Sequence, residues 1–116
     1  MTVNDVLTLV DAYRPSLCEE REKINWIYTL EKQITEHMSR YAQKREADEN
    51  LTPSSNLSLG KEYMDMYVYY VISMIDLANQ DVAMYNNSCA FFNGLFSDWQ
   101  KKWRREHLPH AASKEG

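Results

Sequence analysis

The sequence has little of the material from which turns are built. Its 116 residues include 3 Gly and 3 Pro, whereas a β-sandwich or β-barrel needs a tight turn about every ten residues. A chain of this length is expected to fold as a single unit with a modest core, which weighs against a self-contained enzyme with a deep active site. These shortages predict one small helical domain.

Catalytic and metal-binding patterns are also scarce. Cys18 and Cys89 lie far apart and outside any C-x-x-C pattern, so we expect free thiols in a reducing cytoplasm and no zinc site. His37 falls at the edge of an apolar helical stripe, where we expect a structural role. His107 and His110 lie in the tail, where a metal-binding pair is the weaker interpretation. Glycine-rich phosphate loops and H-E-x-x-H patterns are missing. We therefore predict no catalytic residue, no metal and no cofactor, and a protein that is not an enzyme.

Basic excess and long apolar runs are missing too. The formal net charge of −4 argues against a surface that follows nucleic acid as a whole. The most apolar run, 66–78, is interrupted by Ser73 and Asp76 and is shorter than the roughly 20 residues of a membrane span. No secretion signal follows Met1. We expect a cytoplasmic protein without a membrane partner.

The first two helices show clear start and stop signals. Thr2 and Asp5 form a capping-box pattern, and Arg14-Pro15 ends the first helix because the residue before proline is disfavoured in the α region. Ser16, with Glu19 three residues later, is expected to open the second helix. The predicted apolar faces are Val6, Leu7, Val10 and Tyr13 on the first helix and Ile27, Leu30, Ile34, Met38 and Tyr41 on the second.

Ion pairs four residues apart are expected on the second helix, joining Glu19 to Lys23 and Glu36 to Arg40. The polar segment 42–60 is predicted to be a loop, so the helix should end before Pro53. Segment 61–79 is rich in aromatic and β-branched residues and has strand character, but its length without Gly or Pro favours a helix buried nearly all round.

The last helix has the clearest periodicity. Asp81 is a plausible N-cap after a turn at 79–81, and the helix is expected to reach Glu106. Its apolar seam has steps of three and four residues and comprises Val82, Tyr85, Cys89, Phe92, Phe96, Trp99 and Trp103, flanked by Met84, Ser88, Phe91 and Leu95. We therefore predict an all-α, four-helix domain over 1–106, with a short first helix, a long last helix and a disordered tail over 107–116.

Buried polar groups are expected to hold the last two helices in register. Asp76 should accept hydrogen bonds from neighbours such as Tyr85, Asn79 or Asn86, and Asn93 belongs to the same candidate network. Glu31 lies at the edge of its helix's apolar stripe. Neither acid is followed by a His three residues later, so the Glu-x-x-His pattern of di-iron bundles is missing.

One side of the last helix is a candidate interface. Gly94 costs about 1 kcal/mol relative to Ala in a helix, and with Asn87 and Ala90 it forms a small-residue strip that another backbone can approach, from the same chain or from a neighbouring subunit. The basic, aromatic end offers three interpretations, namely charges that stabilise the helix dipole, a protein partner, or nucleic acid. The candidate interface residues are Asn87, Ala90, Phe91, Gly94, Trp99, Trp103, Arg104 and Arg105.

Two stretches resemble the small helical head-tail connector (adaptor) proteins of tailed phages and of prophages in Gram-positive bacteria. The first contains Val3-Asn4-Asp5-Val6, Tyr13-Arg14-Pro15 and the Trp-containing segment 24–31. The second contains Met74-Ile75-Asp76-Leu77-Ala78-Asn79-Gln80-Asp81, Tyr85-Asn86-Asn87 and Phe92-Asn93, before an aromatic, basic helix end. Segment 42–60 has no counterpart in this resemblance, so the role of the central loop stays open.

The resemblance implies a non-enzymatic subunit that assembles as a ring beneath the portal and extends the channel through which DNA passes. Its partners would be copies of itself, the portal protein and a tail-side completion protein. It would occupy the host cytoplasm during assembly and then the head-tail junction of the virion. The alternative is a small helical nucleic-acid-binding or regulatory interaction protein, which would use Lys101, Lys102, Arg104 and Arg105, with Trp99 or Trp103 stacking on bases.

Overall fold

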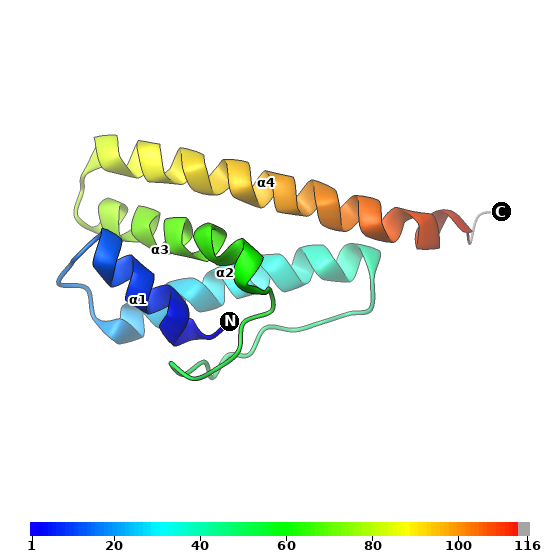
Figure 1. The fold of residues 1–116 in the computed structure, drawn as a ribbon, viewed down its shortest axis with the longest axis horizontal. Coiled ribbons are helices and arrows are strands. Elements are labelled where there is room, and N and C mark those ends of the chain that lie inside the picture. The colour runs from blue at the N-terminus through cyan, green and yellow to red at the C-terminus, as the bar shows by residue number, and fades with distance from the viewer. Residues whose placement is uncertain (114–116) are drawn as a thin grey trace.

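A computed structural model describes the backbone of residues 1–113 and the side chains of residues 1–108. All regular structure in this part of the chain is helical. The elements are α1 (Val3–Tyr13), α2 (Glu20–Tyr41), the short 3-10 turn η1 (Lys61–Tyr63), α3 (Met64–Ala78) and α4 (Val82–Ser113). Figure 1 shows α3 between α4 on one side and α1 and α2 on the other. The predicted all-α, four-helix architecture is confirmed.

Helix α1 begins as its sequence predicts. The backbone N–H of Thr2 donates to Asp5 Oδ2 at 2.9 Å, and the N–H of Asp5 donates to Thr2 Oγ1 at 3.2 Å. The hydrogen bond from Thr2 lowers the pKa of Asp5 below its ordinary value. Val6, Leu7 and Val10 are buried as expected, whereas the prediction for Tyr13 is wrong: this side chain is exposed because α1 ends there and the chain leaves the bundle.

Helix α2 begins later than the sequence pattern predicts. The N-cap residue is Glu19, without a side-chain capping bond, whereas the hydroxyl of Ser16 accepts a hydrogen bond from the N–H of Cys18 within the preceding loop. Serine competes with helical hydrogen bonding in this way and holds the chain in a turn. The expected Glu19–Lys23 ion pair is also wrong, because Lys23 Nζ lies 2.7 Å from Asp11 Oδ1.

The apolar face of α2 is confirmed over most of its length. Ile27, Leu30, Ile34 and Met38 are fully buried, whereas Tyr41 is only partly buried in the last turn. On the outside, Arg40 Nη2 lies 3.0 Å from Glu36 Oε1, as the spacing predicted. The helix ends at Tyr41, well before Pro53.

Segment 42–60 contains no helix, and its second half closes the bottom of the bundle. The carbonyls of Pro53 and Ser55 accept hydrogen bonds from the N–H groups of Asn4 and Val3, at 2.8 and 3.0 Å. These donors in the first turn of α1 have no partner within the helix. Leu57 and Leu59 are buried in the core. The loop is therefore part of the packed domain.

Helix α3 is the centre of the core, which confirms the preference for a helix over a strand in this segment. Nine of its 15 residues are buried, on more than one face. Burial on both sides explains its weakly amphipathic sequence, since a helix packed between others has no wide solvated face.

Helix α4 follows a turn at 79–81 in which Gln80 has a positive φ of 58°. Oδ1 of Asp81 accepts a hydrogen bond from the N–H of Met84 at 3.1 Å, so the predicted N-cap is confirmed. The predicted end at Glu106 is wrong, because the helix continues to Ser113. Pro109 removes one backbone donor and does not by itself end a helix. The tail was predicted over 107–116; of these residues 107–113 are helical, and 114–116 lie outside the described residues.

Candidate interaction surface

The predicted apolar seam of α4 faces the bundle from Phe92 onward. Phe92 and Trp99 are buried, and Phe96 and Trp103 are partly buried. Neighbouring rings along this side have centroids 5.3 to 6.2 Å apart, and His107 stacks on Trp103 at 3.9 Å. The predicted seam residue Val82 is 68% exposed, because it lies in the first turn of α4, next to the turn that joins α4 to α3.

The opposite side of α4 is exposed and uncharged over its first half. No Asp, Glu, Lys, Arg or His occurs between Val82 and Ser97. Asn87, Ala90 and Gly94 recur at a spacing of three and four residues and are exposed, and Phe91 beside them is 57% exposed. Sixteen residues without charge are unusual on a solvated helix surface, which normally carries charged side chains opposite the core. We call this surface the outer face of α4.

Gly94 has open space in front of it. A Cβ placed on Gly94 meets no atom within 4 Å, apart from its chain neighbours and its own helix. The small-residue strip had two interpretations, and the first, a close approach by another part of the same chain, is wrong for the described residues. A neighbouring subunit remains as the alternative.

At the basic end of α4 the charged side chains are exposed, whereas the two tryptophans are buried or partly buried. Lys101, Lys102, Arg104 and Arg105 are exposed. Trp99, in contrast, is 3% exposed and packs against His37 with ring centroids 5.2 Å apart. Trp103 is partly buried, with His107 on its ring and the guanidinium of Arg45 5.6 Å from its ring centroid. Trp99 therefore belongs to the core, and its assignment to an interface or to base stacking is wrong.

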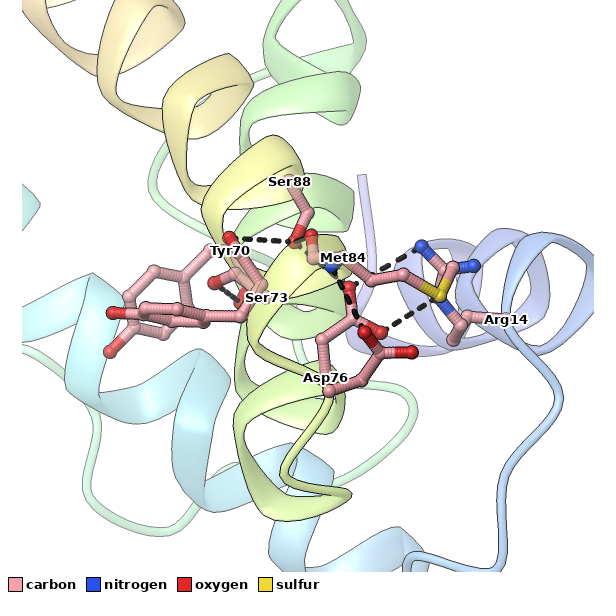
Figure 2. A network of polar contacts seen from close by, with 8 residues as sticks. Arg14, Tyr70, Ser73, Asp76, Met84 and Ser88 are labelled. Carbon is pink, nitrogen blue, oxygen red and sulfur yellow. Dashed lines mark hydrogen bonds and ion pairs between the residues drawn. The ribbon is translucent and has the colours of Figure 1, made fainter.

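The polar network between α3 and α4 contains different partners from those predicted. Asp76 is 2% exposed; its Oδ1 lies 2.9 Å from Nε of Arg14, and its Oδ2 accepts hydrogen bonds from Nη2 of Arg14 at 3.3 Å and from Oγ of Ser88 at 2.9 Å. Figure 2 shows the carboxylate between Arg14, which follows α1, and Ser88 on α4. The structural role of Asp76 therefore stands, with Arg14 and Ser88 as its partners.

The other members of the predicted network do not reach Asp76. Asn79, Asn86 and Asn93 are exposed, and Asn93 Nδ2 lies 3.6 Å from Sγ of Cys89. The neighbouring thiol of Cys89 raises the pKa of Tyr85. The asparagines lie on the solvent side because the core-facing positions of this turn are taken by Ser88 and Phe92.

A second buried carboxylate, Glu31, joins three parts of the fold. It is 3% exposed and accepts hydrogen bonds from the hydroxyl of Tyr67 on α3 and from Oγ and N–H of Ser58 at 2.6 and 3.2 Å. Burial, reinforced by the neighbouring Glu31 charge, raises the pKa of Tyr67. Sequence reasoning placed Glu31 at a helix edge but did not find its donors, which come from the loop and from α3.

His37 is also structural. Its Nε2 lies 3.0 Å from the backbone carbonyl of Gln100, which can only accept, so Nε2 carries the proton. The ring packs between Tyr41 and Trp99. This contact ties the middle of α4 to the end of α2, as expected for a histidine at the edge of an apolar stripe.

The described residues contain no group of three or more His, Cys, Asp or Glu placed to hold a metal ion, and none of their helices is long and apolar enough to span a membrane. Cys18 and Cys89 are both free thiols. Comparison with protein families, curated proteins and solved structures finds no match for this chain.

Proposed function

We propose that this chain is a non-enzymatic structural subunit of a tailed phage or prophage. In this proposal it assembles as a ring on the portal protein and extends the DNA channel at the head-tail junction. Its partners are further copies of the chain, the portal protein and a tail-side completion protein. It acts in the host cytoplasm during assembly and then in the virion. The proposal rests on the resemblance of two sequence stretches and on the outer face of α4.

The outer face of α4 is the observation that carries the proposal. It is uncharged over 82–97, it holds exposed large side chains such as Phe91, and it has open space at Gly94. Burying such a surface against a neighbour removes apolar area from water without desolvating a charge. A contiguous exposed apolar patch is a common mark of a protein–protein contact.

The two sequence stretches that carry the resemblance also meet in space. Arg14 belongs to the first stretch and Asp76 to the second, and these side chains form the ion pair that joins the end of α1 to α3. The resemblance therefore concerns residues that hold one folded unit together, which supports a shared fold more strongly than two unconnected surface motifs would.

Light scattering coupled to sizing chromatography tests the proposal, with the full chain at up to millimolar concentration, alone and with portal protein. We expect concentration-dependent oligomers or a complex with the portal. Ala90→Lys places a charge on the outer face and should weaken both self-association and binding to the portal protein. Ala12→Lys makes the same change on the exposed side of α1 and should weaken neither. A chain that stays monomeric and does not bind the portal contradicts the proposal.

Nucleic-acid binding is the second candidate function. It is favoured by the four exposed cations between Lys101 and Arg105. Such binding should weaken steeply with salt and with removal of these charges, because phosphate contacts release counterions. No shift of a DNA or RNA probe at low salt would dispose of this candidate.

A further inference from the structure

A ring of identical subunits needs two different surfaces on each copy, because head-to-tail contacts pair one patch with another. The outer face of α4 supplies one surface in the proposed function. The outer face leads directly into the basic end of α4. Lys101 and Arg104 follow Ala90 and Gly94 at helical spacing, so they lie on the same side of the helix. The second surface of the chain, which receives the basic end, should therefore be a groove that a helix end can enter. It should be lined by carboxylates that form no ion pair.

Such a groove runs along the outside of α2. One hollow of about 650 Å³ lies between α2, at Tyr28 and Lys32, and segment 44–50. A second hollow of about 390 Å³ continues it toward the start of α2, where Glu20 and Leu51 line it. The two hollows share Tyr28 and Glu49 as lining residues. We call them together the α2 groove.

The carboxylates of the α2 groove fall into two groups. Glu36 is paired with Arg40, and Glu46 lies 3.9 Å from Lys44. Among the side chains that the structure describes, none forms an ion pair with Glu20, Asp48 or Glu49. Glu20 and Glu49 line the hollow at the start of α2, and Asp48 lines the larger hollow next to it.

Most cations of the α2 groove are already engaged within the chain. Lys32 Nζ lies 4.8 Å from the ring centroid of Tyr28, Lys44 faces Glu46, and Arg45 is turned onto Trp103. Arg21 is the remaining cation in the lining. Lys32 and Arg45 keep their charge in these contacts, so the acidic excess is confined to the hollow at the start of α2, where Glu20 and Glu49 stand against Arg21, while the α4 end is basic.

The α4 end carries the complementary charges. Lys101, Arg104 and Arg105 are exposed and form no ion pair with any described side chain. In Figure 1 the end of α4 projects beyond α2, on the opposite side of the molecule from the start of α2 where Glu20 lies. The end of α4 therefore does not reach Glu20 within one chain, and its cations form no ion pair with Asp48 or Glu49, so we expect a second copy to pair them.

We infer that the basic end of α4 of one copy docks in the α2 groove of a second copy, with Lys101, Arg104 and Arg105 facing Glu20, Asp48 and Glu49. The inference rests on the self-association in the proposed function and names its second surface. Complementary charge across an interface sets its register and speeds encounter. Because the two surfaces differ, repeated contacts close into a ring or continue as an open filament.

Sedimentation velocity with charge-swapped variants of the full chain tests this contact. Glu49→Lys and Arg104→Glu should each weaken self-association about tenfold at low salt, and the double variant should recover it, since the opposite charges then face each other again. Lys61→Glu, on η1 and outside both surfaces, is the matched charge reversal and should have no effect. Added salt should reduce the difference between wild type and single variants.

The outcomes separate this inference from the proposed function. A wild-type chain that stays monomeric, alone and with portal protein, overturns the proposed function together with the contact. Self-association that survives both single reversals, or a double variant no better than either single one, overturns the contact alone. Loss of association in Arg104→Glu but not in Glu49→Lys also overturns the pairing, because the basic end then meets a different surface of the second copy.

Discussion

Arg14 and Asp76 form the longest-range ion pair among the described side chains, joining residues 62 positions apart with Nε 2.9 Å from Oδ1. Arg14 follows α1 and is partly exposed, whereas Asp76 is buried on α3 and also receives the hydroxyl of Ser88 on α4. One carboxylate therefore connects three helical elements. The unequal burial of the two partners makes the consequences of removing each one different.

Removal of Arg14 should cost more stability than removal of the charge on Asp76. Arg14→Ala leaves a buried carboxylate without its cation and should cost about 3 kcal/mol. Asp76→Asn keeps an oxygen for Ser88 and lets Arg14 turn toward water, so about 1 to 2 kcal/mol is expected. The two changes together should cost less than their sum in urea unfolding, because they remove one shared interaction.

The exposed pair on α2 is the control for this experiment. Arg40 and Glu36 are both more than half exposed, so Arg40→Ala should change stability by less than about 0.5 kcal/mol. If Arg14→Ala lowered the free energy of unfolding no more than Arg40→Ala, the ion pair with Asp76 would not contribute to stability.

Tyr67 should make the protein less stable in alkali. Its burial beside Glu31 raises the pKa of the hydroxyl in the folded state, whereas in the unfolded chain it ionises near pH 10. The associated stability is present below about pH 10 and is lost as the pH rises further, because the unfolded state then releases its proton first. Tyr67→Phe should flatten this loss in urea unfolding between about pH 8 and pH 11.

At neutral pH, Tyr67→Phe should cost about 1 to 3 kcal/mol, because Glu31 loses a donor and keeps only those of Ser58. Tyr13→Phe is the matched control on an exposed ring and should leave both stability and its pH dependence unchanged. An unaltered alkaline slope in Tyr67→Phe would show that this hydroxyl ionises alike in both states.

The cap of α1 should make stability sensitive to acid. The N–H of Thr2 lowers the pKa of Asp5, so its contribution is present above the unfolded value, about 4, and is lost as the pH falls through the lower folded value. In the Asp5→Asn variant the free energy of unfolding should therefore fall less steeply as the pH drops below about 4. Asp98→Asn, on the exposed side of α4, should keep the wild-type slope, and equal slopes in all three proteins would contradict the prediction.

Gly94 should show opposite effects on folding and on assembly. Its added Cβ meets no neighbour, so Gly94→Ala should stabilise the monomer by about 0.5 to 1 kcal/mol through helix propensity. If a second backbone approaches here, Gly94→Gln should weaken self-association while leaving the circular dichroism spectrum unchanged. Ser97→Gln, one turn further along α4, provides a comparison, and association that tolerates Gly94→Gln fully would exclude close approach at this residue.

Much of the fold follows from local sequence. The start of α1 is determined by Thr2 and Asp5 and its end by Pro15, since capping and ring sterics act within a few residues. The buried face of α2 follows from helical spacing alone. Helix α3 was recognised by its length without helix breakers, although its composition has strand character.

The start of α2 and the end of α4 were not predictable from the same rules. At Ser16, a turn and a helix cap use the same hydroxyl, and the choice depends on how the loop leaves α1. At Pro109, ring sterics weaken a helix without deciding whether it ends. Local signals of this kind shift a boundary by several residues when the rest of the chain favours another arrangement.

The sequence by itself determined that this chain is a small all-helical domain whose last helix carries an uncharged face and a basic end. Only the tertiary structure decided that Asp76 pairs with Arg14, that Glu31 receives Tyr67 and Ser58, and that Trp99 belongs to the core. The physical reason is that buried polar and aromatic groups take partners from distant segments, and packing selects those partners. Periodicity tells which side of a helix is buried, but not what it meets there.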